Sequence, residues 1–297
     1  MSDDFWYEGI PFPRVFCSPE LLRKAQEEFV IKDEDVVTVT FPKSGTHWLI
    51  EILGLIHSKG DTKWIQSVPI WERSPWIETE LGFTVANKEG PRLLSSHLPI
   101  HLFPKSFFSS KAKVIYVIRN PKDVIVSGYF YWISVNFSKK PKSVEQFLEW
   151  FLEGNVPYGS WFDHIRGWVS MRERENFLML SYEELKRDTE GTVEKICQFL
   201  GKKAESEELS LILKNSSFQA MRENKMSNYS LLGDAYLVHK NPLLRKGKRK
   251  FSGFKMSQNT WGAFLCLQQV LTAEMKKGLN VFNANCSPPR AFPLSPH

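Results

Sequence analysis

Four residues whose types together suit an anion occur in succession at Lys43, Ser44, Gly45 and Thr46. They follow Val36–Thr40, a β-branched run that is typical of a strand buried on both faces. Apolar residues then recur at helical spacing as far as residue 56. Because the first turn of a helix carries free N–H groups and partial positive charge, this strand–loop–helix unit predicts a phosphate or sulfate site.

The same loop is not a Walker A loop, because its lysine precedes the glycine and no earlier glycine stands at the spacing that the motif requires. We also find no acidic pair placed to hold Mg²⁺. Both observations make a P-loop nucleotide kinase a weaker alternative. An ordinary strand-to-helix turn with a surface lysine is the simplest alternative, but the four residue types together, directly after a buried strand, favour the anion site.

A second strand–loop–helix unit begins with the apolar run Val114–Ile118 and leads into Arg119. Asn120 suits the N-cap of the next helix, Pro121 its first position, and Asp123 its positive end. The planar guanidinium of an arginine matches a phosphate group. The unit therefore predicts a second place where an anionic ligand binds.

Further strands are predicted at 177–180 and, more briefly, at 93–95. Helices are predicted at 144–153, opened by a capping box of Ser143 and Gln146, and at 161–171, 192–200 and 207–214. Alternation of strands and helices indicates an α/β fold: a single three-layer domain with a central parallel sheet flanked by helices.

The composition excludes several classes of protein. The chain has 297 residues, 42% of them hydrophobic, and its 39 Lys and Arg against 33 Asp and Glu give a net charge of +6. These values are typical of a globular protein and exclude a disordered or collagenous chain. No apolar stretch approaches the ~20 residues of a membrane span, and we expect no signal peptide. Four scattered cysteines predict no zinc site and a cytoplasmic location.

Three motifs in this order resemble the cytosolic sulfotransferase family. Pro42–Trp48 resembles its phosphosulfate-binding loop, Tyr116–Ser127 its 3′-phosphate-binding segment, and Arg245–Gly247 its late Arg-Lys-Gly element. The likeness runs almost unbroken from Met1 to Gly247 and is greatest to the alcohol (hydroxysteroid) branch, on the stretches that begin at Trp64 and Asn224. It implies a P-loop-like donor site for 3′-phosphoadenosine 5′-phosphosulfate (PAPS) and no metal.

The resemblance also implies a role for each donor-site residue. Lys43 would neutralise charge on the leaving phosphate, and Arg119 with Ser127 would bind the 3′-phosphate. The family most often has Asn where this chain has His47. The donor residues implied are Lys43, Ser44, Gly45, Thr46, His47, Trp48, Arg119, Ser127, Tyr182, Ser216, Phe218, Met221, Arg245, Lys246 and Gly247.

His97 would be the general base that removes the proton of the acceptor hydroxyl, a task that suits an imidazole. Without the resemblance a structural histidine would be the better interpretation. His101 lies four residues later, but Pro99 interrupts the helix that would align the two rings on a zinc ion.

The acceptor is expected to be a hydroxysteroid or bile acid, since an apolar pocket lined by rings suits a flat apolar alcohol. Taken singly, each ring is more typical of core packing. The rings at family pocket positions are Trp71, Trp76, Tyr131, Trp132, Phe137, Tyr229 and Tyr236.

The chain departs from the family after Gly247, where the Gly-Asp-Trp-Lys segment and the dimer motif are missing. We therefore expect a divergent stretch at 248–282 that completes a sulfotransferase domain at 1–282, a disordered tail at 283–297, and no family-type homodimer. Two alternatives stay open: an impaired relative that binds PAPS or steroid without useful turnover, and, supported only by the basic run at 248–255, a nucleic-acid binder.

Overall fold

The computed structural model describes residues 4–233, 236–238 and 244. All of them belong to the larger of the two compact units of the chain, Met1–Gly253; the other unit is Phe254–His297. The predictions for Arg245–Gly247, for the stretch 248–282 and for the tail at 283–297 lie outside the described residues.

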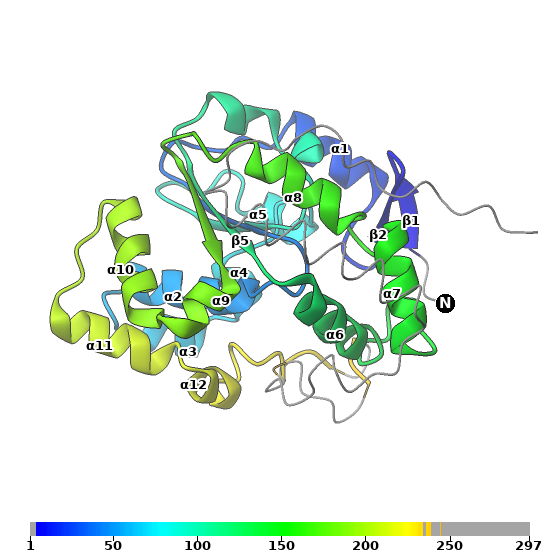
Figure 1. Cartoon of the computed structure of the whole chain (residues 1–297). Helices are drawn as coiled ribbons and strands as arrows, with labels where there is room; N and C mark the ends of the chain where they lie inside the picture. The colour runs from blue at the N-terminus through cyan, green and yellow to red at the C-terminus, as the bar shows by residue number, and fades with distance from the viewer. Residues whose placement is uncertain (1–3, 234–235, 239–243, 245–297) are drawn as a thin grey trace, which may run out of the picture. The chain divides into compact units, whose positions relative to one another are not determined.

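A four-stranded parallel sheet forms the centre of the described unit (Figure 1). Its strands are β3 (Val36–Thr40), β4 (Leu93–Ser96), β5 (Lys113–Ile118) and β6 (Phe177–Ser181), in the order β4-β3-β5-β6. All neighbouring pairs are parallel. The four predicted strands are therefore confirmed, and their carboxyl ends meet at one edge of the sheet.

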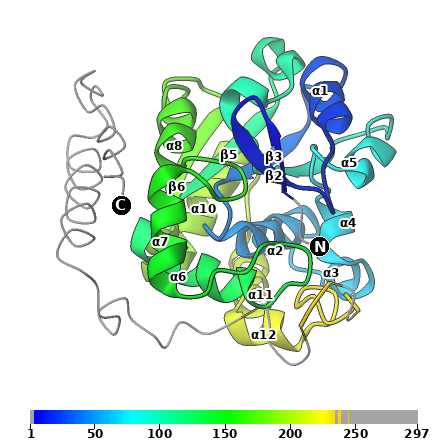
Figure 2. The same cartoon turned by 90° about the vertical axis from the view of Figure 1, so that its right-hand side faces the viewer.

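Helices pack on both faces of this sheet, which confirms the α/β three-layer fold (Figures 1 and 2). On one face, Ile115 and Val117 of β5 pack in a buried apolar cluster with Leu49 and Ile52. On the other face, the ring of Tyr116 lies 5.9 Å from that of Trp168. Alternate residues of one strand thus enter different layers, as expected for a strand covered on both faces.

The helices that matter most for the site are α2 (Thr46–His57), α6 (Pro121–Trp132), α8 (Trp161–Val169), α9 (Tyr182–Arg187), α11 (Ser206–Asn215) and α12 (Phe218–Glu223). The others are α1 (Pro19–Glu27), α3 (Lys63–Ser67), α4 (Ile70–Arg73), α5 (Glu80–Thr84), α7 (Val144–Glu153) and α10 (Thr189–Leu200), with the 3₁₀ turns η1 (Ile100–Leu102) and η2 (Lys105–Ser109).

The predicted helix starts are largely confirmed. The side chain of Asn120 accepts the N–H of Lys122, and Pro121 opens α6. At α7, Ser143 accepts the N–H of Gln146 as predicted, but the Gln146 side chain accepts the N–H of Lys142. The reciprocal half of the predicted capping box is therefore wrong, because Gln146 reaches one residue further back.

An antiparallel hairpin at the N-terminus was not predicted. It pairs β1 (Asp4–Tyr7) with β2 (Ile10–Pro13), and Pro11 accepts the N–H of Tyr158. Strands of four residues, one with two prolines, carry too little alternation to be recognised in a sequence.

Candidate active site

The ends of β3, β4, β5 and β6 bring together the residues predicted to do chemistry. Lys43, His97 and Arg119 lie in the loops after β3, β4 and β5, and Tyr182, the first residue of α9, follows β6 directly. These residues are far apart in the sequence, but parallel strands place all four at the same edge of the sheet.

Gly45 holds the loop after β3 in a shape that other residues would disturb. Its φ is +109°, and a Cβ added there would lie 2.7 Å from a ring carbon of Tyr182. Lys43 also has a left-handed backbone, with φ +71°. The loop therefore curls tightly before α2 begins, as the anion-site interpretation requires.

Arg119 joins this loop to the neighbouring strand. Its Nη1 donates to the carbonyl oxygen of Lys43 at 2.7 Å, and its guanidinium lies 4.2 Å from the ring centroid of Tyr182. Trp48 completes the group, with its ring 5.7 Å from that of Tyr182. The Arg119 and Tyr182 side chains are thus held against the loop from the β5 and β6 sides.

Four predicted donor residues hold a buried polar atom without a hydrogen-bond partner. These atoms are Ser44 Oγ, Trp48 Nε1, Arg119 Nε and Ser216 Oγ, four of the nine such atoms in the described part of the chain. A buried donor that lacks an acceptor costs about 1–3 kcal/mol. Because the oxygens of phosphate and sulfate groups accept such bonds and complement the Arg119 charge, these four donors fit a doubly phosphorylated ligand.

His97 has a defined tautomer. Its Nδ1 lies 2.8 Å from the carbonyl oxygen of Thr40, which can only accept, so Nδ1 carries the proton and Nε2 keeps a lone pair. Burial, together with the charge of Lys43, lowers the pKa of His97 to about 4, whereas the hydrogen bond to Thr40 opposes that shift. At neutral pH the ring is therefore uncharged and able to accept a proton.

The backbone of His97 is fixed from two further sides. Its N–H donates to Oε1 of Glu78 at 2.8 Å, and its carbonyl oxygen accepts from Nε2 of His164 at 3.1 Å. Nδ1 of His164 in turn lies 3.0 Å from the hydroxyl of Tyr116, which must donate to it. Thr40, Glu78 and His164 are site residues that sequence reasoning missed, because only the crossover connections bring them to His97.

The predicted acceptor rings form two groups. Trp76 lies between His97 and His47, with ring centroids 5.8 and 5.9 Å away, and Tyr229 contacts both His47 and Trp71. The second group begins where Nζ of Lys43 lies 4.0 Å from the ring centroid of Tyr131. From Tyr131 the group continues to Trp132, then Phe137, then Tyr236. The centroids of successive rings are 4.9, 6.4 and 6.4 Å apart.

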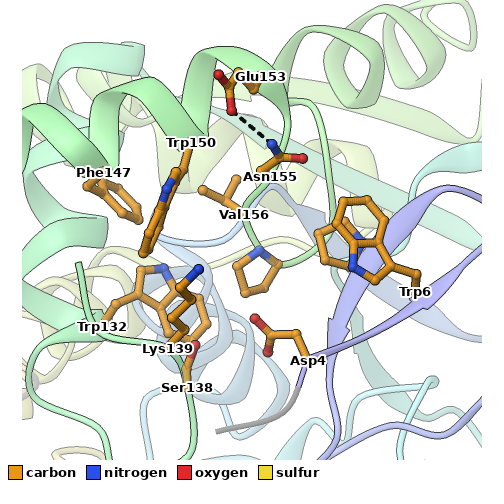
Figure 3. Close-up of a pocket in the computed structure, with 12 residues that line it drawn as sticks. Asp4, Trp6, Trp132, Ser138, Lys139, Phe147, Trp150, Glu153, Asn155 and Val156 are labelled. Carbon is orange, nitrogen blue, oxygen red and sulfur yellow. Dashed lines mark hydrogen bonds between the residues drawn. The ribbon is translucent and has the colours of Figure 1, made fainter. Parts of the chain in front are cut away.

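Trp132 also borders a separate hollow of about 360 Å³ near the N-terminal hairpin (Figure 3). Trp6, Phe147 and Trp150 line it, and Nζ of Lys139 lies 4.8 Å from the Trp150 ring centroid. Neither His97 nor any predicted donor residue lines this hollow. It is therefore not the place where the chemistry predicted from the sequence occurs.

The remaining predicted donor residues are less tightly joined to the loop. Thr46 is buried and its hydroxyl contacts that of Thr40 at 2.7 Å. Ser127 is half-buried in α6, and Met221 is buried in α12. Phe218 is the first residue of α12.

Comparison with known proteins decides the family. The sulfotransferase domain matches residues 33–259. This chain belongs to the sulfotransferase family. It is 70% identical to "Sulfotransferase 2A1" of Homo sapiens, covering 83% of this chain and 87% of that protein. It is 61% identical to the "3-beta-hydroxysteroid sulfotransferase" of Cavia porcellus, with the same coverage.

The fold agrees with this assignment. The crystal structure of mouse sulfotransferase SULT7A1 complexed with PAP matches this sulfotransferase with a TM-score of 0.76 at 28% identity, over 93% of this chain and 97% of that one. The described part of the chain contains no helix that is long and apolar enough to cross a membrane. Nor does it contain a group of three or more His, Cys, Asp or Glu side chains that could hold a metal ion.

Proposed function

We propose that this sulfotransferase transfers the sulfuryl group of PAPS to the hydroxyl of a hydrophobic alcohol such as a hydroxysteroid or bile acid. The observation that carries the proposal is that Ser44 in the loop after β3, Trp48 in the first turn of α2 and Arg119 after β5 hold buried donors without a partner, while His97 at the same edge of the sheet has a neutral imidazole with a free Nε2. The hydroxysteroid names of relatives from Cavia porcellus support the acceptor class.

Each described group has a place in the reaction. Nε2 of His97 removes the proton of the acceptor hydroxyl as that oxygen attacks sulfur, and the bond from sulfur to the phosphate oxygen breaks in line. Lys43 balances the charge left on that phosphate, while the N–H groups of the loop hold its other oxygens. The products are a sulfate ester and adenosine 3′,5′-bisphosphate.

The acceptor would lie against the rings beside His97 and Lys43. Trp76 beside His97 and Tyr131 beside Lys43 present apolar faces where a flat ring system packs well. We further propose a cytoplasmic location, in line with the thiols of Cys17 and Cys197, which are free and buried. A homodimer of the family type is not part of the proposal, since its motif is missing after Gly247.

Labelled PAPS with a panel of hydroxysteroids, bile acids and phenols tests the proposal on the full chain. We expect transfer of label to a hydroxysteroid, and thermal stabilisation by adenosine 3′,5′-bisphosphate. Adenosine 3′,5′-bisphosphate at a hundredfold excess over its Kd should add about 2.7 kcal/mol to the free energy of unfolding. Stabilisation without transfer to any member of the panel would instead identify the impaired binder, which no described residue favours at present.

A further inference from the structure

His47 stands at the junction of two parts of the site. Its backbone belongs to the first turn of α2, at the anion-binding loop, but its ring faces the acceptor side. Nε2 is hydrogen-bonded to the hydroxyl of Tyr229, and the two ring centroids are 4.7 Å apart. The same ring lies 5.9 Å from Trp76, the neighbour of His97.

Tyr229 needs such a partner because its backbone is in an unfavourable conformation. Its φ of +64° lies in the left-handed region, which a bulky side chain rarely adopts. Conformations of this kind persist where the surrounding contacts fix them. Before Tyr229 the chain is fixed by Ser227, whose hydroxyl bonds to both carboxylate oxygens of Glu51 at 3.0 Å; at its tip only His47 gives the tyrosine hydroxyl a partner among the described residues.

The hydrogen bond between His47 and Tyr229 also affects the polarity of the surface that would face the acceptor. While Nε2 of His47 and the hydroxyl of Tyr229 bind one another, neither presents an unpaired polar group to an apolar ligand. Burial, followed by the charges of Lys43, His97 and Arg73, holds the pKa of His47 well below its usual value, and burial raises the pKa of Tyr229. Both groups are therefore uncharged near neutral pH, so a single proton bridges them.

We propose that His47 is a specificity-determining residue for the acceptor: its side chain fixes Tyr229 as part of the wall beside Trp71 and Trp76. This inference rests on the proposed function and deepens it. The donor is bound by the backbone N–H groups of the loop, which any side chain at position 47 retains. His47 thus acts on the acceptor through Tyr229, as a positioning residue.

Two substitutions test whether the side chain at His47 must be long enough to bond the Tyr229 hydroxyl. His47→Gln places an amide about where Nε2 lies, whereas the shorter side chain of His47→Asn does not extend to Tyr229. Tyr229→Phe removes the hydroxyl and keeps the ring. The probes are androsterone and epiandrosterone, which differ only in the orientation of the 3-hydroxyl, with PAPS as donor and the full chain as enzyme.

We expect His47→Asn and Tyr229→Phe each to raise the acceptor KM about threefold to tenfold, the range of one net hydrogen bond. The ratio of kcat/KM between the two epimers should shift, His47→Gln should restore both values, and the KM for PAPS should stay within about twofold. The double variant His47→Asn with Tyr229→Phe should be no worse than either single variant, because both remove the same bond.

An unchanged acceptor KM and an unchanged epimer ratio in folded His47→Asn and Tyr229→Phe would overturn this inference and leave the proposed function standing. A rise in the KM for PAPS only would place His47 on the donor side and overturn it too. If His47→Asn does not fold, as judged by its melting curve, Tyr229→Phe carries the test. Failure of the unaltered protein to sulfate either steroid, or any other member of the panel, is a different result: it removes the proposed function and this inference with it.

Discussion

The carbonyl oxygen of Thr40 and Nδ1 of His97 lie 2.8 Å apart, and this contact fixes the tautomer of the His97 ring. Thr40 is the last residue of β3. His97 follows the last residue of β4, the strand that pairs with β3. The strand that leads into the proposed anion-binding loop therefore also orients the proposed general base.

Substitution of His97 separates its base function from this structural bond. His97→Asn keeps an N–H where Nδ1 donates to Thr40, but it has no counterpart of Nε2. We expect both His97→Asn and His97→Ala to lower kcat by about 10²–10⁴-fold, the usual value of general base catalysis. His97→Asn should melt closer to the unaltered protein. Sulfation rates and melting curves measure both; turnover retained in His97→Asn would exclude His97 as the base.

Acid should destabilise this protein through its buried histidines. The pKa is about 4 for His97 and about 3 for His164, both lowered mainly by burial from a usual value of 6.5. Because the unfolded chain binds protons first, stability is complete above pH 6.5 and is lost as the pH falls through these values. Each pKa unit is worth about 1.4 kcal/mol, so the full loss is on the order of 3 kcal/mol for His97 and 5 kcal/mol for His164.

Urea unfolding at pH 7, 5.5 and 4.5 measures this loss. The midpoint should fall with pH, and His97→Asn should reduce the slope. His101→Gln is the matched control: His101 is exposed and contributes only a smaller part of the His164 shift, so its substitution should change the slope less than His97→Asn does. Glu78 changes stability in the opposite direction over the same pH range, so the comparison of variants decides the test: a pH slope of His97→Asn equal to that of the unaltered protein would contradict the expectation.

Glu78 should act in the opposite direction. Burial raises its pKa from 4.5 to about 7, although the N–H of His97 opposes that shift. Between pH 4.5 and 7 the unfolded chain releases this proton and the folded chain retains it. Its contribution to stability is therefore complete below pH 4.5 and is lost as the pH rises to 7, by at most about 3 kcal/mol.

The variant Glu78→Gln isolates this effect, because its amide oxygen can still accept the N–H of His97. Relative to the unaltered protein, the variant should gain stability between pH 5 and pH 8. Comparing the two proteins at each pH removes the contribution of the histidines, which both share. A stability difference that does not depend on pH would show that Glu78 is already ionised when buried.

The sequence predicted the loops of this site well, because local signals define them. Gly45 after a β-branched strand and Asn120 before Pro121 act through neighbouring residues, and a parallel sheet must bring their loops to one edge. The supporting contacts carry no such signal. Glu78 reaches His97 from 19 residues away, and Tyr229 reaches His47 from 182 residues away, through tertiary packing alone.

Arg119 should discriminate between two nucleotides. If Arg119 binds the 3′-phosphate, Arg119→Ala should raise the Kd for adenosine 3′,5′-bisphosphate by about tenfold to a hundredfold, which corresponds to the loss of one charge-assisted hydrogen bond. The Kd for adenosine 5′-phosphate, which lacks the 3′-phosphate, should rise much less. Thermal shift titrations with both ligands measure the difference. Equal weakening would mean that Arg119 acts only through its bond to the Lys43 carbonyl.

The buried ion pair below the acceptor wall should dominate the stability of that region. Nη2 of Arg73 lies 2.8 Å from Oε2 of Glu51 with both side chains fully buried, and it also donates to Ser227 at 2.9 Å. Burial already raises the pKa of Glu51, with Arg73 opposing it. Arg73→Met would leave that carboxylate without its partner, so we expect a loss of about 3–5 kcal/mol in the free energy of unfolding.

Replacing both partners should be milder than replacing one. Arg73→Met combined with Glu51→Met removes both charges, and it should recover much of the loss. Lys24→Met is the exposed control: the Lys24–Glu20 pair is 3.0 Å long but solvated, and its removal should lower the free energy of unfolding by less than about 1 kcal/mol.

Because Ser227 fixes the chain before Tyr229, Arg73→Met should also raise the acceptor KM. Urea unfolding and steroid kinetics on the same variants test both effects, and an Arg73→Met protein as stable as the Lys24→Met control would refute them.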